Sequence, residues 1–127
     1  MTILDENIPE DQRQLLRSWR VRARQIGVEI GRPGLQDDEI ISLLHRLERS
    51  TFLTRDLGSY RPYLPHPRYG LVCLAVSQYE AASFIRRFLR HPEFRTQARR
   101  SGRVVQVNPR GITFWRLHAE EEERVEW

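Results

Sequence analysis

The chain has 127 residues, of which 30% are charged and 39% hydrophobic, and its formal net charge is +4. This length suits a single core, so we expect residues 1–127 to form one domain in which residues 118–127 are a Glu-rich C-terminal tail. No apolar stretch approaches the roughly 20 residues that cross a bilayer, and we therefore expect a cytoplasmic protein without membrane contact.

The basic residues are all arginine, 21 in total, and lysine is absent. Arginine binds phosphate at two points and stacks on bases, so a positive surface of this kind favours a polyanionic partner. A genome rich in G and C would also replace lysine by arginine, and the electrostatic consequence is the same. A DNA-binding protein is a weaker interpretation, since no helix-turn-helix or other groove-reading pattern is present.

The first elements are a short buried strand, a helix and an edge strand. Met1–Leu4 is apolar and stops at Asp5, which indicates a strand. Asn7 has the pattern of a helix cap, with a proline in the first turn, and predicts a helix to about Trp19. The segment at residues 21–25 has Val21, Ala23 and Gln25 in alternation with Arg20, Arg22 and Arg24, as in a half-exposed edge strand.

A second group of elements follows the glycine-bearing loop at residues 27–34. The segment Asp37–Glu48 has one apolar stripe and predicts a helix, and Thr51–Thr54 predicts a strand. Residues 57–68 contain three prolines and are expected to be a surface loop. Tyr60 in this loop is a candidate for the rim of a binding cleft.

The last part of the chain predicts a central strand, a helix and an antiparallel pair. Gly70–Val76 is the most apolar run and contains the single cysteine, whose thiol we expect to be buried and inert. A capping box at Ser77 opens a helix that Pro92 ends, and a second helical piece is expected to Arg100. Two alternating runs, residues 103–107 and 112–117, are joined by a turn.

The tail at Glu120–Glu123 is interpreted as a solvated helix face or a frayed end. An alternative is that the tail folds toward arginines and competes with nucleic acid. Strands that alternate with helices predict an α/β sandwich whose sheet is mainly parallel and has an antiparallel C-terminal edge.

Three aspartates stand where a strand ends or a helix begins. Asp5 follows the first strand, Asp56 follows the strand at 51–54, and Asp37 starts a helix. Sites in such sheets form at the carboxyl ends of strands, so we expect these acids to converge. Carboxylates are ligands for Mg²⁺ or Mn²⁺, which can activate water for the hydrolysis of a phosphodiester. Each aspartate also has a local explanation, as a turn or cap residue.

The order of these acids resembles the small PIN-like nucleases, in particular a subgroup that begins with a Leu-Leu-Asp-Glu-Asn type of strand end. The matching stretches are Ile3-Leu4-Asp5-Glu6-Asn7, Asp37-Asp38-Glu39-Ile40 and Phe52-Leu53-Thr54-Arg55-Asp56. The resemblance implies a three-layer α/β/α fold and a ribonuclease that uses Mg²⁺ or Mn²⁺ bound by Asp5, Asp37 and Asp56. It also implies RNA as substrate, a toxin with a cognate antitoxin protein, and often a homodimer.

The chain departs from the pattern after the third acid. The family usually continues as Asp-x-Asp-Phe, and here Gly58 stands at the place of the second acid. The alternative is therefore a PIN-like module that has lost catalysis and binds RNA or protein. Arg55 and Tyr60 are secondary candidates for contact with the substrate.

Overall fold

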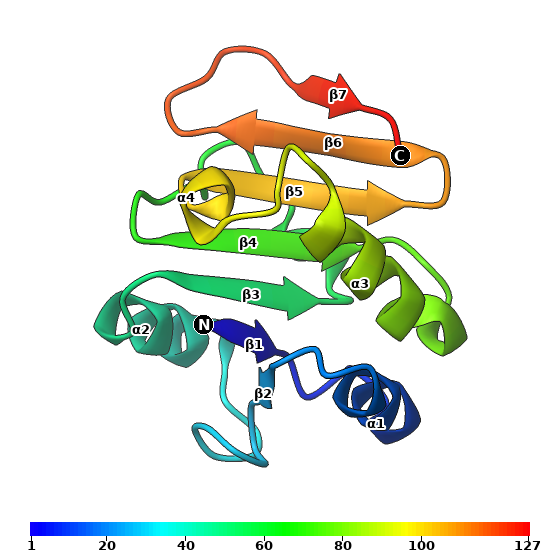
Figure 1. The fold of residues 1–127 in the computed structure, drawn as a ribbon. Helices are drawn as coiled ribbons and strands as arrows, with labels where there is room; N and C mark the ends of the chain where they lie inside the picture. The colour runs from blue at the N-terminus through cyan, green and yellow to red at the C-terminus, as the bar shows by residue number, and fades with distance from the viewer.

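The computed structural model describes residues 1–127 and contains a seven-stranded sheet with the order β2-β1-β3-β4-β5-β6-β7 (Figure 1). Its strands are β1 (Thr2–Leu4), β2 (Arg24–Gln25), β3 (Ser50–Thr54), β4 (Tyr69–Leu74), β5 (Arg103–Asn108), β6 (Gly111–Arg116) and β7 (Glu123–Val125). The pairs between β2 and β5 are parallel, whereas β6 and β7 are antiparallel. The expected α/β class, with a mainly parallel sheet and an antiparallel C-terminal edge, is confirmed.

Helices cover both faces of this sheet. Neighbouring residues of a strand point to opposite faces, so Phe52 and Leu53 of β3 enter two separate cores. Leu53 packs with residues of α1 (Glu10–Ser18) and α3 (Ala81–Arg90), and Phe52 packs with residues of α2 (Asp37–Arg46). The short α4 (Gln97–Arg100) lies on the same side as α3, where Arg100 donates to the Thr51 hydroxyl.

The chain changes direction across the sheet between β1 and β3. From β1 it passes through α1 to β2 at one edge, and from β2 it passes through α2 to β3 on the other side of β1. A sheet of this kind has a crevice at the carboxyl ends of the two strands where the order reverses. The ends of β1 and β3 are therefore the place where the fold favours a site.

Two predicted boundaries on the N-terminal side are wrong. Asn7 does not cap α1, because the helix begins at Glu10 and the Asn7 side chain bonds to β3 and the residue after it. The edge strand expected at residues 21–25 contains only Arg24 and Gln25, which pair with Ile3 and Leu4 of the three-residue β1. The neighbouring strand is thus too short to pair with the rest of the segment.

The C-terminal tail is not helical: Glu120, Glu121 and Glu122 are solvated, as expected, and the residues that follow them join the sheet. Residues 123–125 form β7 on β6, and the Trp127 indole N–H donates to the Asn108 carbonyl at 2.8 Å. Arg87 of α3 places its guanidinium 4.4 Å from the centroid of the Trp127 ring. The helical piece expected over residues 92–100 is also shorter than predicted and is limited to α4. None of the helices combines the length and apolarity that a membrane crossing requires.

Candidate active site

A cavity of about 410 Å³ at the carboxyl ends of β1 and β3 gathers four of the five aspartates. Asp5 and Asp56 come from the two strand ends, and Asp37 and Asp38 come from the first turn of α2. Its apolar walls are formed by residues of α2, the sheet and the loop after β3, namely Ile40, Ile41, Phe52, Leu71 and Leu64. The three aspartates singled out in the sequence therefore line one cavity.

Asp5 is the most enclosed acid of this cavity. Its carboxylate accepts hydrogen bonds from the Thr54 hydroxyl at 2.6 Å and from the Glu6 backbone N–H at 2.8 Å. Burial raises the pKa of Asp5 above its ordinary value, and the nearby charges of Glu6 and Asp56 act in the same direction, whereas the two hydrogen bonds oppose them. A bound cation would offset the repulsion between these neighbouring carboxylates.

Thr54 connects the two strand-end acids and was missed by the sequence analysis. Its buried hydroxyl donates to Asp5 and accepts from the Asp56 backbone N–H at 3.0 Å and from the Asn7 amide at 3.2 Å. One donor and two acceptor sites of this hydroxyl are thus used. Asn7 also accepts from the Arg55 N–H at 3.2 Å, which fastens the chain after β1 to the chain after β3.

Asp56 has a local role as well as a place in the cavity. Its Oδ1 accepts from the Gly58 N–H at 2.9 Å and caps the short 3₁₀ helix Leu57–Ser59. The turn at this position was one of the local explanations considered above. The cap uses one carboxylate oxygen, and the other oxygen has no hydrogen-bond partner in the protein.

The start of α2 is held by residues other than its own aspartates. Gln36 precedes the helix, and the Glu39 side chain accepts from the Gln36 N–H at 3.1 Å, so Asp37 is not the cap. Glu6 accepts from the Gly34 N–H at 2.7 Å and thereby fastens the loop that leads into α2. Asp37 and Asp38 remain exposed to solvent at the cavity.

Arg55 and Tyr60 do not line this cavity. Arg55 is half-buried, and its Nε atom has no hydrogen-bond partner. The Tyr60 hydroxyl donates to Glu122 at 2.6 Å, and burial raises the pKa of Tyr60, with the hydrogen bond to Glu122 acting in the same direction. Tyr60 therefore fastens the loop after β3 to the segment between β6 and β7.

The donor set of the cavity suits a hard cation with few protein ligands. No three acidic, histidine or cysteine side chains come close enough together to form a complete metal cage. Mg²⁺ usually keeps several waters and needs only one or two carboxylates, which Asp5 and Asp56 can supply. A Cβ atom at Gly58 would lie 3.0 Å from Asp56 Oδ1, so a side chain at this position would be in tight contact with the Asp56 carboxylate.

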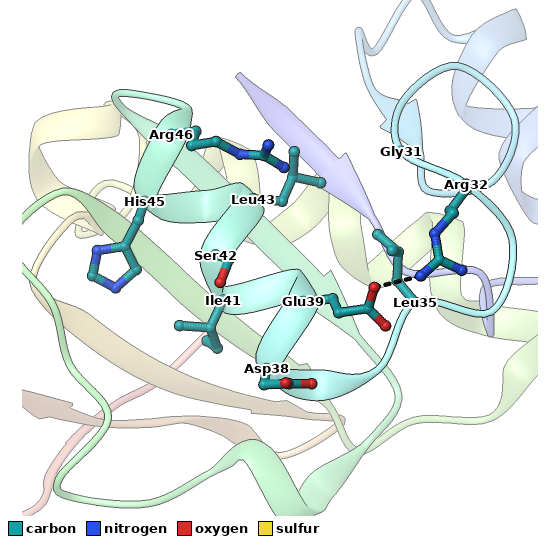
Figure 2. A pocket seen from close by; sticks show the side chains of 10 residues that line it. All are labelled: Gly31, Arg32, Leu35, Asp38, Glu39, Ile41, Ser42, Leu43, His45 and Arg46. Carbon is teal, nitrogen blue, oxygen red and sulfur yellow. Dashed lines mark hydrogen bonds and ion pairs between the residues drawn. The ribbon is translucent and has the colours of Figure 1, made fainter.

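A second hollow, of about 830 Å³, lies along α2 (Figure 2). Figure 2 shows Glu39 and Arg32 joined as an ion pair, with His45 and Arg46 near the other end of the helix. Neither β1 nor β3 contributes a residue to this hollow, and Asp38 is the only aspartate in it. We therefore place the candidate active site in the smaller cavity.

Comparisons with known protein families, curated proteins and solved structures found no match to this chain.

Proposed function

We propose that this protein is a PIN-like ribonuclease that uses Mg²⁺ or Mn²⁺ to hydrolyse RNA phosphodiester bonds. The observation that carries the proposal is the cavity at the carboxyl ends of β1 and β3, which gathers Asp5, Asp37 and Asp56 where the strand order reverses. The resemblance of the three acidic stretches to PIN-like nucleases supports the same assignment, including its three-layer fold.

Asp5 and Asp56 are the residues that would hold the cation. The ion would supply positive charge for the phosphate oxygens and would activate water for attack. Thr54 keeps the Asp5 carboxylate in place through the 2.6 Å hydrogen bond, while Asp37 and Asp38 add negative charge on the α2 side. Phe52 and Leu71, which are paired on the neighbouring strands β3 and β4, add an apolar wall to the cavity.

A second candidate function is an RNA-binding or protein-interaction module with a PIN-like fold and no catalysis. Gly58 favours this alternative, because it removes one carboxylate from the family pattern. The lack of any group of three possible ligands at coordinating distance also favours it. Binding of Mn²⁺ that depends on Asp5 distinguishes the two, since a degenerate module does not require it.

The biological role that we propose is that of a toxin whose activity a cognate antitoxin protein restrains. The resemblance to PIN-like toxins and the arginine-rich surface, which favours RNA as the target, support this role. A homodimer is part of the same proposal. Growth arrest after induced expression, absent with Asp5→Asn, is the expected result, and equal arrest by both proteins would contradict the toxin role.

The nuclease proposal is tested by single amide substitutions of the cavity acids. Asp5→Asn and Asp56→Asn should each lower Mn²⁺-dependent cleavage of RNA by about 10²-fold or more, because a charged ligand is lost. Asp11→Asn is the matched control, since this exposed fifth aspartate lies on α1 and outside the cavity. Retained cleavage by both cavity variants, with the fold verified by circular dichroism, would reject the assignment.

A further inference from the structure

A third hollow, which we call the arginine groove, lies between α1 and the segment that leads to the edge strand β2. Its volume is about 580 Å³. Its ten lining residues include five arginines and one acid, namely Arg13, Arg17, Arg20, Arg22, Arg24 and Glu29. The excess of positive charge in this groove is opposite in sign to that of the candidate active site, whose charged residues are all aspartates.

The alternation of residues 20–24 explains why the arginines face outward. Val21 and Ala23 pack against the core beneath α1 and α3, so Arg20, Arg22 and Arg24 between and beside them are exposed. The chain reverses after α1 through a left-handed residue, Arg20, at φ 61°. This reversal returns the segment alongside α1, whose last turn adds the exposed Arg17.

Four of these arginines have no acid to neutralise them. Arg13 takes the single acid of the groove, with 2.7 Å between its guanidinium and Glu29. Glu29 also accepts from the Gln25 backbone N–H at 2.6 Å, so both its oxygens are used within the protein. Arg17, Arg20, Arg22 and Arg24 form no ion pair with any carboxylate.

The positive surface continues from the arginine groove onto α3. Arg86 lies 3.8 Å from the centroid of the Trp19 ring, which joins the end of α1 to α3. Arg90 is exposed on the same helix, and it too has no carboxylate partner. An extended array of unpaired guanidinium groups favours a long polyanion over a single small anion.

We propose that the arginine groove binds the phosphodiester backbone of a nucleic-acid strand at a distance from the candidate active site. A groove lined by forked guanidinium groups fits a narrow chain of phosphates, whereas a flat bilayer surface would not enter it. The lining of the groove includes Leu4, which immediately precedes Asp5 in the chain. The Leu4 side chain packs in the core on the face of the sheet that α1 and α3 cover.

This inference rests on the proposed function for the identity of the polyanion, and its test separates the two. Binding of a labelled oligouridine of about 20 nucleotides is measured by fluorescence anisotropy. The protein carries Asp5→Asn in every measurement, so that no result depends on cleavage. The groove variant is Arg22→Ala with Arg24→Ala. The matched control is Arg95→Ala with Arg110→Ala, two exposed arginines that have no ion pair and lie outside the arginine groove.

The groove variant should bind oligouridine roughly 25-fold more weakly at 0.1 M salt, and the slope of log K against log salt should fall by about 1.4. This follows from two phosphate contacts at about 0.7 each on a single strand. The control should keep both the affinity and the slope. Replacement of the same two residues by lysine should restore most of the slope, because the charge is retained.

An oligothymidine of the same length identifies the nucleic acid. An equal loss of affinity for both oligonucleotides would show that the groove binds the backbone of RNA and DNA alike. A loss of affinity for the RNA alone would show that the groove is specific for RNA. Unchanged affinity of the groove variant, or an equal loss in the control, would overturn the proposal. If the protein with Asp5 intact cleaves no RNA while the groove variant still loses binding, the nuclease function fails and the groove stands.

Discussion

Replacement of Thr54 by valine tests whether this buried hydroxyl organises the candidate active site. Valine keeps the shape of the side chain and removes the hydroxyl that donates to Asp5 at 2.6 Å and accepts from the Asp56 N–H and the Asn7 amide. The bond to the charged carboxylate contributes about 1.5–3 kcal/mol, and the bond from the backbone N–H about 1 kcal/mol. We expect Thr54→Val to lower the free energy of unfolding by about 2–4 kcal/mol.

That loss corresponds to a fall in Tm of roughly 6 to 16 °C for a domain of this size, measurable by calorimetry. The Thr54 hydrogen bond also holds down the pKa of Asp5, so the pH at which metal-dependent cleavage begins should move upward in Thr54→Val. Thr54→Ser is the matched control, because it keeps the hydroxyl and loses one methyl group. A Tm within 2 °C of the wild type (a threshold of about 0.5 kcal/mol) would refute the role of this hydroxyl.

Three further results are expected. Under the proposed PIN-like site, Gly58→Asp should strengthen Mn²⁺ binding in calorimetry, because it adds a carboxylate to the residue whose Cβ would lie 3.0 Å from Asp56 Oδ1, and unchanged affinity would show that an acid at this position is irrelevant. Trp127→Ala should lower the free energy of unfolding in urea by about 1–3 kcal/mol, since the indole is half-buried against α3, and a freely frayed tail would show no change. Burial raises the folded-state pKa of Asp5, so its contribution to stability is present below its ordinary pKa and is lost as pH rises through the folded value. Asp5→Asn should therefore gain stability relative to the wild type as pH rises above the ordinary pKa of an aspartate, and a stability difference that stays constant with pH in denaturant titrations would contradict this.

The sheet could be predicted because its strands carry their own signal. Phe52 and Leu53 are both apolar, and a strand with two apolar faces must be covered on both sides. The aspartates after β1 and β3 could be placed at one edge because the carboxyl ends of parallel neighbours coincide. The convergence of Asp5 and Asp56 in one cavity followed from these two steps.

The support around the acids could not be predicted, because it depends on contacts that are distant in the chain. Asn7 has a good local pattern for a helix cap, yet its amide binds Thr54, 47 residues later. Thr54 itself has no local motif, and only the pairing of β1 with β3 brings its hydroxyl to Asp5. Glu6 follows Asp5 directly in the chain, and only the fold shows that it accepts a hydrogen bond from Gly34 in the loop before α2.

The structure of the C-terminal tail could not be predicted for the same reason, because it also depends on a contact with a distant strand. Its glutamates suggested a solvated helix, whereas the pairing of β7 with β6 is decided by the free edge that β6 offers. The alternative in which the tail folds toward arginines matches one contact within the chain, the ion pair between Arg116 and Glu123. A role of that contact in nucleic-acid binding stays a prediction.

The most direct test of the central claim is calorimetric titration of Mn²⁺ into the wild-type protein, Asp5→Asn, Asp56→Asn and the control Asp11→Asn. We expect one Mn²⁺-dependent heat signal in the wild type and the control, and at least a tenfold weaker affinity in each cavity variant, about 1.4 kcal/mol of binding free energy. Equal Mn²⁺ affinity in all four proteins would contradict the account, because the cation would then be bound elsewhere or only by general charge.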